Sequence, residues 1–145
     1  MLGTQAAVTG AAALVLGTLD LHTHAPHLTA LVSFGALAAA WTRLVLMLRA
    51  PSCQSRQLVL LGATLLLAYT LVYLAIPTAF SNTLPPPKQL PGLHRTVDAL
   101  YFTTTTATTV GYGDRVPVTT LARVLVMSQY AAGACLAVLI ANHFA

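Results

Sequence analysis

Four apolar runs divide the chain, separated by polar or proline-containing segments. The runs cover residues 2–19, 28–48, 57–76 and 118–145. Each is close to the ~20 residues that an α-helix needs to cross a hydrocarbon core of ~30 Å. No Lys or Arg precedes the first run, so we expect it to stay in the membrane rather than act as a cleaved signal peptide. The pattern predicts an all-α membrane protein with four transmembrane helices.

The segment between the third and fourth runs has a different character. Residues 78–95 are rich in proline, which favours a stiff extended turret. Residues 96–107 fit a short helix, with Thr96 as its N-cap and Asp98 in its first turn. This helix is too short to span the bilayer, so we expect it to be re-entrant. Irregular backbone at membrane depth must be buried in protein or line water, so the loop that follows cannot face lipid.

Composition supports the membrane assignment and excludes several functions. The chain is 57% hydrophobic and only 7% charged, whereas soluble domains carry about 25% charged residues. The net charge of +4 is too sparse for a nucleic-acid surface, and anionic lipid headgroups are a sufficient partner for it. Cys53 and Cys135 form neither a metal nor a disulfide framework. We expect no enzymatic activity, no cofactor and no small-molecule substrate.

Residues 1–56 are expected to form a unit of two transmembrane helices and a basic connector. Arg43, Leu46 and Arg49 follow the every-third-residue spacing of a voltage sensor, but leucine occupies the middle place. Interfacial arginines are favoured, and weak voltage sensing stays open. The basic connector at 49–56 favours cytoplasmic termini, although basic residues beyond the third run nearly balance it. The histidines at 22–27 match no standard metal site and favour a polar surface loop.

The loop at residues 108–114, Thr-Thr-Val-Gly-Tyr-Gly-Asp, carries the chemistry. Gly111 and Gly113 tolerate positive φ, so successive carbonyls can turn toward one line and replace the water around a cation. One chain supplies only one row of oxygens. A complete ring therefore needs several copies of the chain around an axis.

This loop and its flanks resemble the pore domain of bacterial potassium channels. The resemblance extends from Ala107 through the loop to Pro117, Arg123 and Gly133 at similar spacings. It implies a pore domain at 57–145, divided into an outer helix at 57–77, a turret at 78–95, a pore helix at 96–107, a filter at 108–114 and an inner helix at 117–144. It also implies a homotetramer in the cell membrane, with the filter at the outer face, which supports cytoplasmic termini.

The resemblance also assigns roles to residues. Stacked K⁺ sites would use the backbone carbonyls of four consecutive residues, with the hydroxyl of the first, and a glycine completes the filter: Thr109, Val110, Gly111, Tyr112 and Gly113. Residues expected to support the filter include an aromatic cuff and an outer acid: Tyr101, Phe102, Thr105, Thr108 and Asp114. Thr105 stands where some bacterial members carry glutamate, so a carboxyl pair with Asp114 is not expected.

On the last helix, the resemblance places a gating hinge at Gly133 and inner-cavity positions at Ala134, Ala137 and Ala141. Helix packing is the alternative for these small residues. The favoured function is a passive potassium-selective channel, because Tyr112 argues for potassium over sodium. A non-selective monovalent cation channel and a weakly voltage-sensitive potassium channel remain alternatives. A transporter would usually carry several such loops, and this chain has one.

Overall fold

The computed structural model describes residues 26–49, 55–82 and 93–144. Its elements are α2 (Pro26–Arg49), α3 (Ser55–Ala75), a 3-10 turn (Pro77–Ala79), β1 (Phe80–Asn82), α4 (Leu93–Ala107), β2 (Arg115–Pro117) and α5 (Thr120–Phe144). Within these residues, α2, α3 and α5 are long and apolar enough to cross a membrane, which confirms three of the four expected spans. The expected first span, Cys53 and the turret prolines lie outside the described residues.

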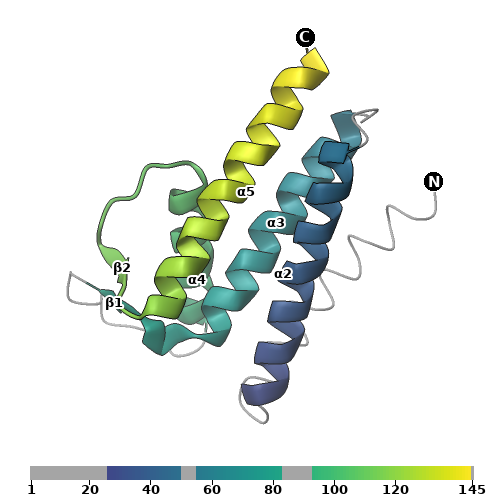
Figure 1. Ribbon diagram of the computed structural model, residues 1–145. Coiled ribbons are helices and arrows are strands. Elements are labelled where there is room, and N and C mark those ends of the chain that lie inside the picture. Colours follow the sequence, from purple (N-terminus) through teal and green to yellow (C-terminus); the bar gives the residue numbers. More distant parts are fainter. Residues whose placement is uncertain (1–25, 50–54, 83–92, 145) are drawn as a thin grey trace.

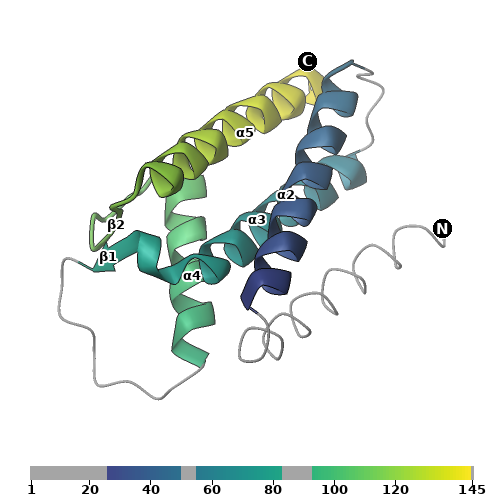
Figure 2. The same cartoon turned by 60° about the horizontal axis from the view of Figure 1, so that its bottom comes forward.

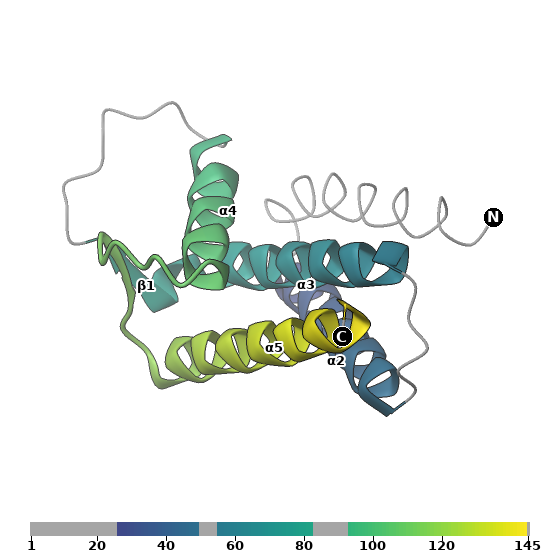
Figure 3. The same cartoon turned by 90° about the horizontal axis from the view of Figure 1, so that it is seen from above.

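The three long helices run side by side, with α3 antiparallel to α2 and α5 (Figure 1). The shorter helix α4 lies across this group at one end, and the loop at residues 108–114 leads from it toward α5 (Figures 2 and 3). Helix α3 is central because 56% of its apolar stretch is buried, against 22% in α2 and in α5. Many apolar side chains of α2 and α5 are instead exposed, as expected of faces that meet lipid or another chain.

A short antiparallel strand pair, β1 with β2, joins the end of α3 to the start of α5. Phe80 pairs with Pro117, and Asn82 pairs with Arg115. The Val118 amide extends the contact by donating to the Ala79 carbonyl at 2.9 Å. Nothing in the alternation of these short segments predicts the pair, and the expected all-helical fold lacks it.

Three expected helix starts are wrong. Pro117 does not begin the inner helix, because it pairs in β2 and α5 begins at Thr120. The Thr119 hydroxyl accepts a hydrogen bond from the Ala122 amide at 3.2 Å and so caps the helix. Helix α4 begins at Leu93, so Thr96 lies inside it instead of capping it, and Asp98 lies beyond the first turn. The outer helix is shifted by two residues, to Ser55–Ala75.

Candidate functional site

The loop after α4 has a backbone of alternating handedness. Thr109, Gly111 and Gly113 have φ angles of 59°, 50° and 75°, and the intervening Val110 and Tyr112 do not have positive φ. Successive peptide planes normally point their carbonyls in opposite directions along an extended chain. Reversing the handedness at every second residue turns successive carbonyls to the same side. The loop can therefore present a row of oxygens to one ligand.

Thr109 is the part of this pattern that sequence reasoning missed. Among the described residues, it is the only residue other than glycine with a positive φ. A β-branched side chain disfavours this region, and such backbone strain costs on the order of 1–3 kcal/mol. Threonine gives no signal for it in the sequence. The surrounding structure must therefore impose the conformation.

Hydrogen bonds from the loop amides to the end of α4 impose that conformation. The Thr109 amide donates to the Thr106 carbonyl at 3.1 Å. The Val110 and Gly111 amides both donate to the Thr105 carbonyl, at 3.0 and 3.2 Å. Within the described part of the chain, no backbone amide donates to the carbonyls of residues 109–112. The amides of Thr109, Val110 and Gly111 thus bond to α4, and the four consecutive carbonyls of residues 109–112 accept no backbone amide of the described residues.

The hydroxyls of Thr103, Thr104 and Thr105, and that of Thr108 just after α4, donate to carbonyls of α4. The Thr103 and Thr104 hydroxyls donate to carbonyls one turn earlier in α4, each at 2.8 Å. The Thr105 hydroxyl donates to the Phe102 carbonyl at 3.1 Å, and that of Thr108 donates to the Thr104 carbonyl at 2.8 Å. Thr105 therefore contacts the loop through its carbonyl.

The two aromatic residues expected to form a cuff lie in different places. Tyr101 stacks on Tyr112, with ring centres 6.3 Å apart and planes 6° from parallel. Phe102 packs instead against Tyr73 and Phe80, at 5.2 and 4.8 Å between ring centres. Neighbouring residues of a helix point in different directions, which separates the two rings. Tyr101 contacts the loop after α4, whereas Phe102 packs α4 against α3 and β1.

The end of the loop next to β2 carries charged residues. The Asp114 carboxylate accepts the Arg115 amide at 3.0 Å. The Arg115 guanidinium lies 5.3 Å from the centre of the Phe80 ring, and partial burial lowers its pKa, while Asp98 and then Asp114 raise it. Among the described residues, its Nε and Nη1 atoms have no hydrogen-bond partner. Arg115 is thus held by aromatic and longer-range electrostatic contacts.

The expected hinge and cavity residues lie on the exposed side of α5. Gly133, Ala134, Ala137 and Ala141 are all exposed in the single chain. A Cβ added at Gly133 would meet no heavy atom within 4 Å. These residues are therefore open to a cavity or to another chain, and the packing alternative is not decided.

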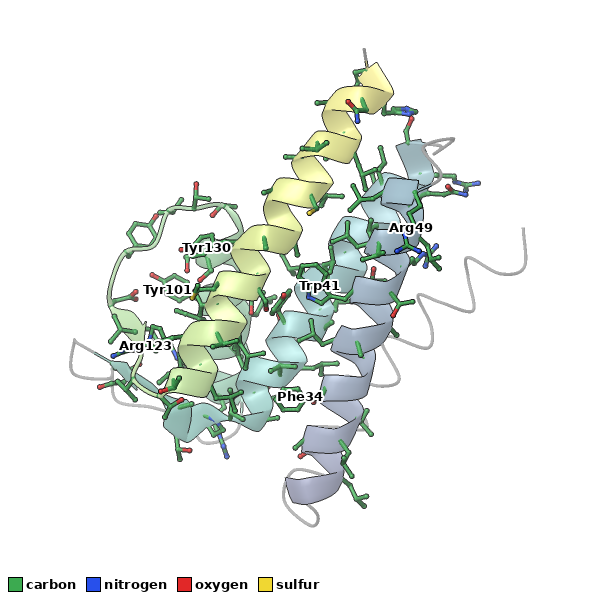
Figure 4. The ribbon with its side chains drawn as sticks, in the orientation of Figure 1. Phe34, Trp41, Arg49, Tyr101, Arg123 and Tyr130 are labelled. Carbon is green, nitrogen blue, oxygen red and sulfur yellow. The ribbon has the colours of Figure 1, made fainter. Side chains whose placement is uncertain are left out.

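The arginines of α2 are not gathered on one buried face. Arg43 is half-buried and Arg49 is exposed. Figure 4 shows Arg49 near one end of α2, directed away from α5. Weak voltage sensing, if present, would therefore depend on two arginines that differ in burial.

Comparison with known proteins finds one family whose model covers this loop. The model of a family described as ion channel matches residues 59–145, which is more than half of the chain. The match includes most of α3 and all of α4, the loop and α5. No curated protein and no solved structure matches the chain.

Proposed function

Because the chain belongs to the ion-channel family whose model matches residues 59–145, we propose that it conducts potassium passively through a pore formed by four copies. Ion channels are non-enzymatic membrane proteins, as the sequence predicts. The row of carbonyls at residues 109–112, to which no backbone amide of the described residues donates, is the observation that carries the proposal. Such oxygens can replace the hydration shell of a monovalent cation, and adjacent sites allow ions to leave by mutual repulsion.

The need for further copies follows from the exposure of the loop in one chain. Tyr112 is 71% exposed and Val110 is 52% exposed. On α5, Val124 and Met127 are 56% and 69% exposed. A polar loop at membrane depth cannot face lipid, so neighbouring copies must cover it. A fourfold arrangement places the four rows of carbonyls around one axis, as the resemblance to potassium channels implies.

Selectivity for potassium is proposed from the packing behind the carbonyls. The Tyr112 ring stacks on Tyr101 of α4 and so ties the loop to the helix behind it. Together with the amide bonds to Thr105, this contact limits the width to which the loop can adjust. A ring held at one width favours the ion whose hydration shell it replaces best. A non-selective cation channel is the alternative if the loop widens.

Potassium efflux from liposomes containing the purified full chain tests this function. We expect potassium flux with sodium nearly excluded, and mass measurement in detergent should give four copies. Equal fluxes of the two ions would contradict potassium selectivity and favour the non-selective alternative. Absence of any cation flux from correctly folded tetramers would contradict the channel proposal. We also place the termini on the cytoplasmic side of the cell membrane, which accessibility labelling of cysteines introduced near each end tests.

A further inference from the structure

We propose that α2 is a functional part of the pore, and that Trp41 is a positioning residue through which α2 sets the rotation of α5. Residues 26–49 precede the matched family region, and the proposed conduction assigns them no role. Trp41 nevertheless points from α2 into the middle of the helix group, toward α5 (Figure 4). The electrical part of the proposal rests on the proposed channel function.

A chain of hydrogen bonds connects the three long helices at this level. The Trp41 Nε1–H group donates to the Tyr69 hydroxyl on α3 at 3.0 Å. The Tyr69 hydroxyl lies 2.8 Å from the Ser128 hydroxyl on α5. Ser128 in turn donates to the Leu125 carbonyl at 2.7 Å. The chain therefore runs from α2 through α3 to the backbone of α5.

The direction of every proton in this chain follows from chemistry. Indole nitrogen can only donate, and a carbonyl can only accept. Ser128 gives its single proton to the Leu125 carbonyl, so Tyr69 must donate to Ser128 and accept from Trp41. Such head-to-tail bonds polarise one another, and Tyr69 is only 1% exposed, so lost bonds are not replaced by water.

A second connection fixes the neighbouring residue of α5. The Thr103 carbonyl on α4 accepts from the Gln129 amide nitrogen at 2.8 Å. The Gln129 amide oxygen accepts from the Tyr73 hydroxyl, also at 2.8 Å. Tyr69 and Tyr73 lie one turn apart on α3, and Ser128 and Gln129 are adjacent on α5. Two fixed points in different directions determine both the height and the rotation of α5.

The rotation of α5 decides which of its residues face the proposed pore axis. Gly133 and Ala137 follow the two fixed points by one to two turns and are exposed in the single chain. The Ser128 connection includes α2, whereas the Gln129 connection uses only the pore elements. Loss of the Trp41 bond should therefore change the balance between conformations of α5 while the filter loop keeps its bonds to α4.

Fluorescence gives a readout that is independent of conduction, because Trp41 is the sole tryptophan of the chain. We expect the full chain carrying Tyr69→Phe to emit at shorter wavelength than wild type, since the indole loses its hydrogen-bond acceptor. Thr42→Val is the matched control, because the Thr42 hydroxyl bonds within α2 to the Ala38 carbonyl at 2.8 Å. Unchanged emission from Tyr69→Phe, or an equal shift from Thr42→Val, would overturn the connection.

Single-channel recording tests the consequence for the pore. Hydrogen bonds between membrane helices are worth about 0.6 kcal/mol on average and up to about 1.7, so we expect Trp41→Phe to change the ratio of open to closed time about 3-fold to 20-fold. Tyr69→Phe should act in the same direction, and the double variant should change little further. Potassium-to-sodium selectivity should stay unchanged in all three.

Unchanged gating in both single variants, or additive effects in the double variant, would overturn the role of Trp41. Tyr69→Phe removes only a hydroxyl, so it remains informative if Trp41→Phe disturbs packing. A wild-type protein that conducts nothing would refute the proposed channel function. The fluorescence result would still decide whether Trp41 and Tyr69 are connected, so the two failures are distinguishable.

Discussion

Replacing Gln129 with leucine should destabilise the protein through the partner that the change leaves behind. The Gln129 side chain is 5% exposed and bonds Tyr73 and the Thr103 carbonyl, each at 2.8 Å. Leucine fills a similar volume without polar atoms. The Thr103 carbonyl keeps its place in α4, but the buried Tyr73 hydroxyl loses its acceptor. An orphaned buried donor costs about 1–3 kcal/mol, so we expect a loss of about 2 kcal/mol in the free energy of unfolding.

The assay is unfolding of the full chain in mixed micelles titrated with a denaturing detergent and followed by circular dichroism. A double-mutant cycle compares Gln129→Leu, Tyr73→Phe and the double variant. The double variant removes the orphaned hydroxyl together with its former acceptor. It should recover most of the loss, because the destabilising group is gone. Tyr130→Phe is a control on the neighbouring residue, which is 46% exposed, and should change stability by less than about 0.5 kcal/mol.

A double variant that loses the full sum of the two single losses would refute this reasoning. That result would mean that Gln129 and Tyr73 act independently, through packing alone. A loss below about 0.5 kcal/mol in Gln129→Leu would equally contradict it, because the Tyr73 hydroxyl would then have another acceptor. Recovery in the double variant assigns the energy to the hydrogen bond itself.

Three further changes test other parts of the structure. Gly111→Ala should abolish potassium flux in liposomes, because alanine at a φ of 50° costs about 1–2 kcal/mol. Gly133→Ala is the control, because its methyl meets no neighbour and the variant should fold normally. Full flux from Gly111→Ala would contradict the assigned loop geometry. Thr119→Ala should lower the free energy of unfolding by about 1 kcal/mol through loss of the α5 cap, and an unchanged value would show that the cap is not needed. Gly62→Ala should cost under about 1 kcal/mol in the same assay, because its methyl would lie 3.3 Å from the flexible end of Leu136; a loss above about 3 kcal/mol would show that α3 and α5 cannot adjust there.

The long apolar runs made the three described spans predictable, because their length alone matches the membrane. Gly111 and Gly113 likewise indicated positive φ, since glycine adopts it without a Cβ clash. Thr109 could not be predicted in the same conformation, because its own preference opposes it. Bonds from the loop amides to α4 overcome that preference, and such bonds appear only once α4 and the loop are placed together.

Contacts between distant segments were also beyond the sequence. The pattern could place Tyr69 and Tyr73 on one face of a helix, but it could not name Ser128 and Gln129 as their partners. Tyr101 and Phe102 looked equivalent because both are aromatic and adjacent. The rotation of α4 separates them and directs only Tyr101 to the loop. The start of a helix depends on local capping. The Thr119 cap makes α5 begin at Thr120 instead of at the expected Pro117.

The strand pair β1–β2 has a consequence for insertions into the chain. Pairing these two strands closes the segment that contains α4 and the loop at residues 108–114. Closing a segment costs conformational entropy, and that cost rises only slowly with the length of the segment. Doubling the length of a flexible loop adds only about 0.6 kcal/mol to this cost. An insertion within this segment should therefore cost little stability as long as β1 and β2 stay paired.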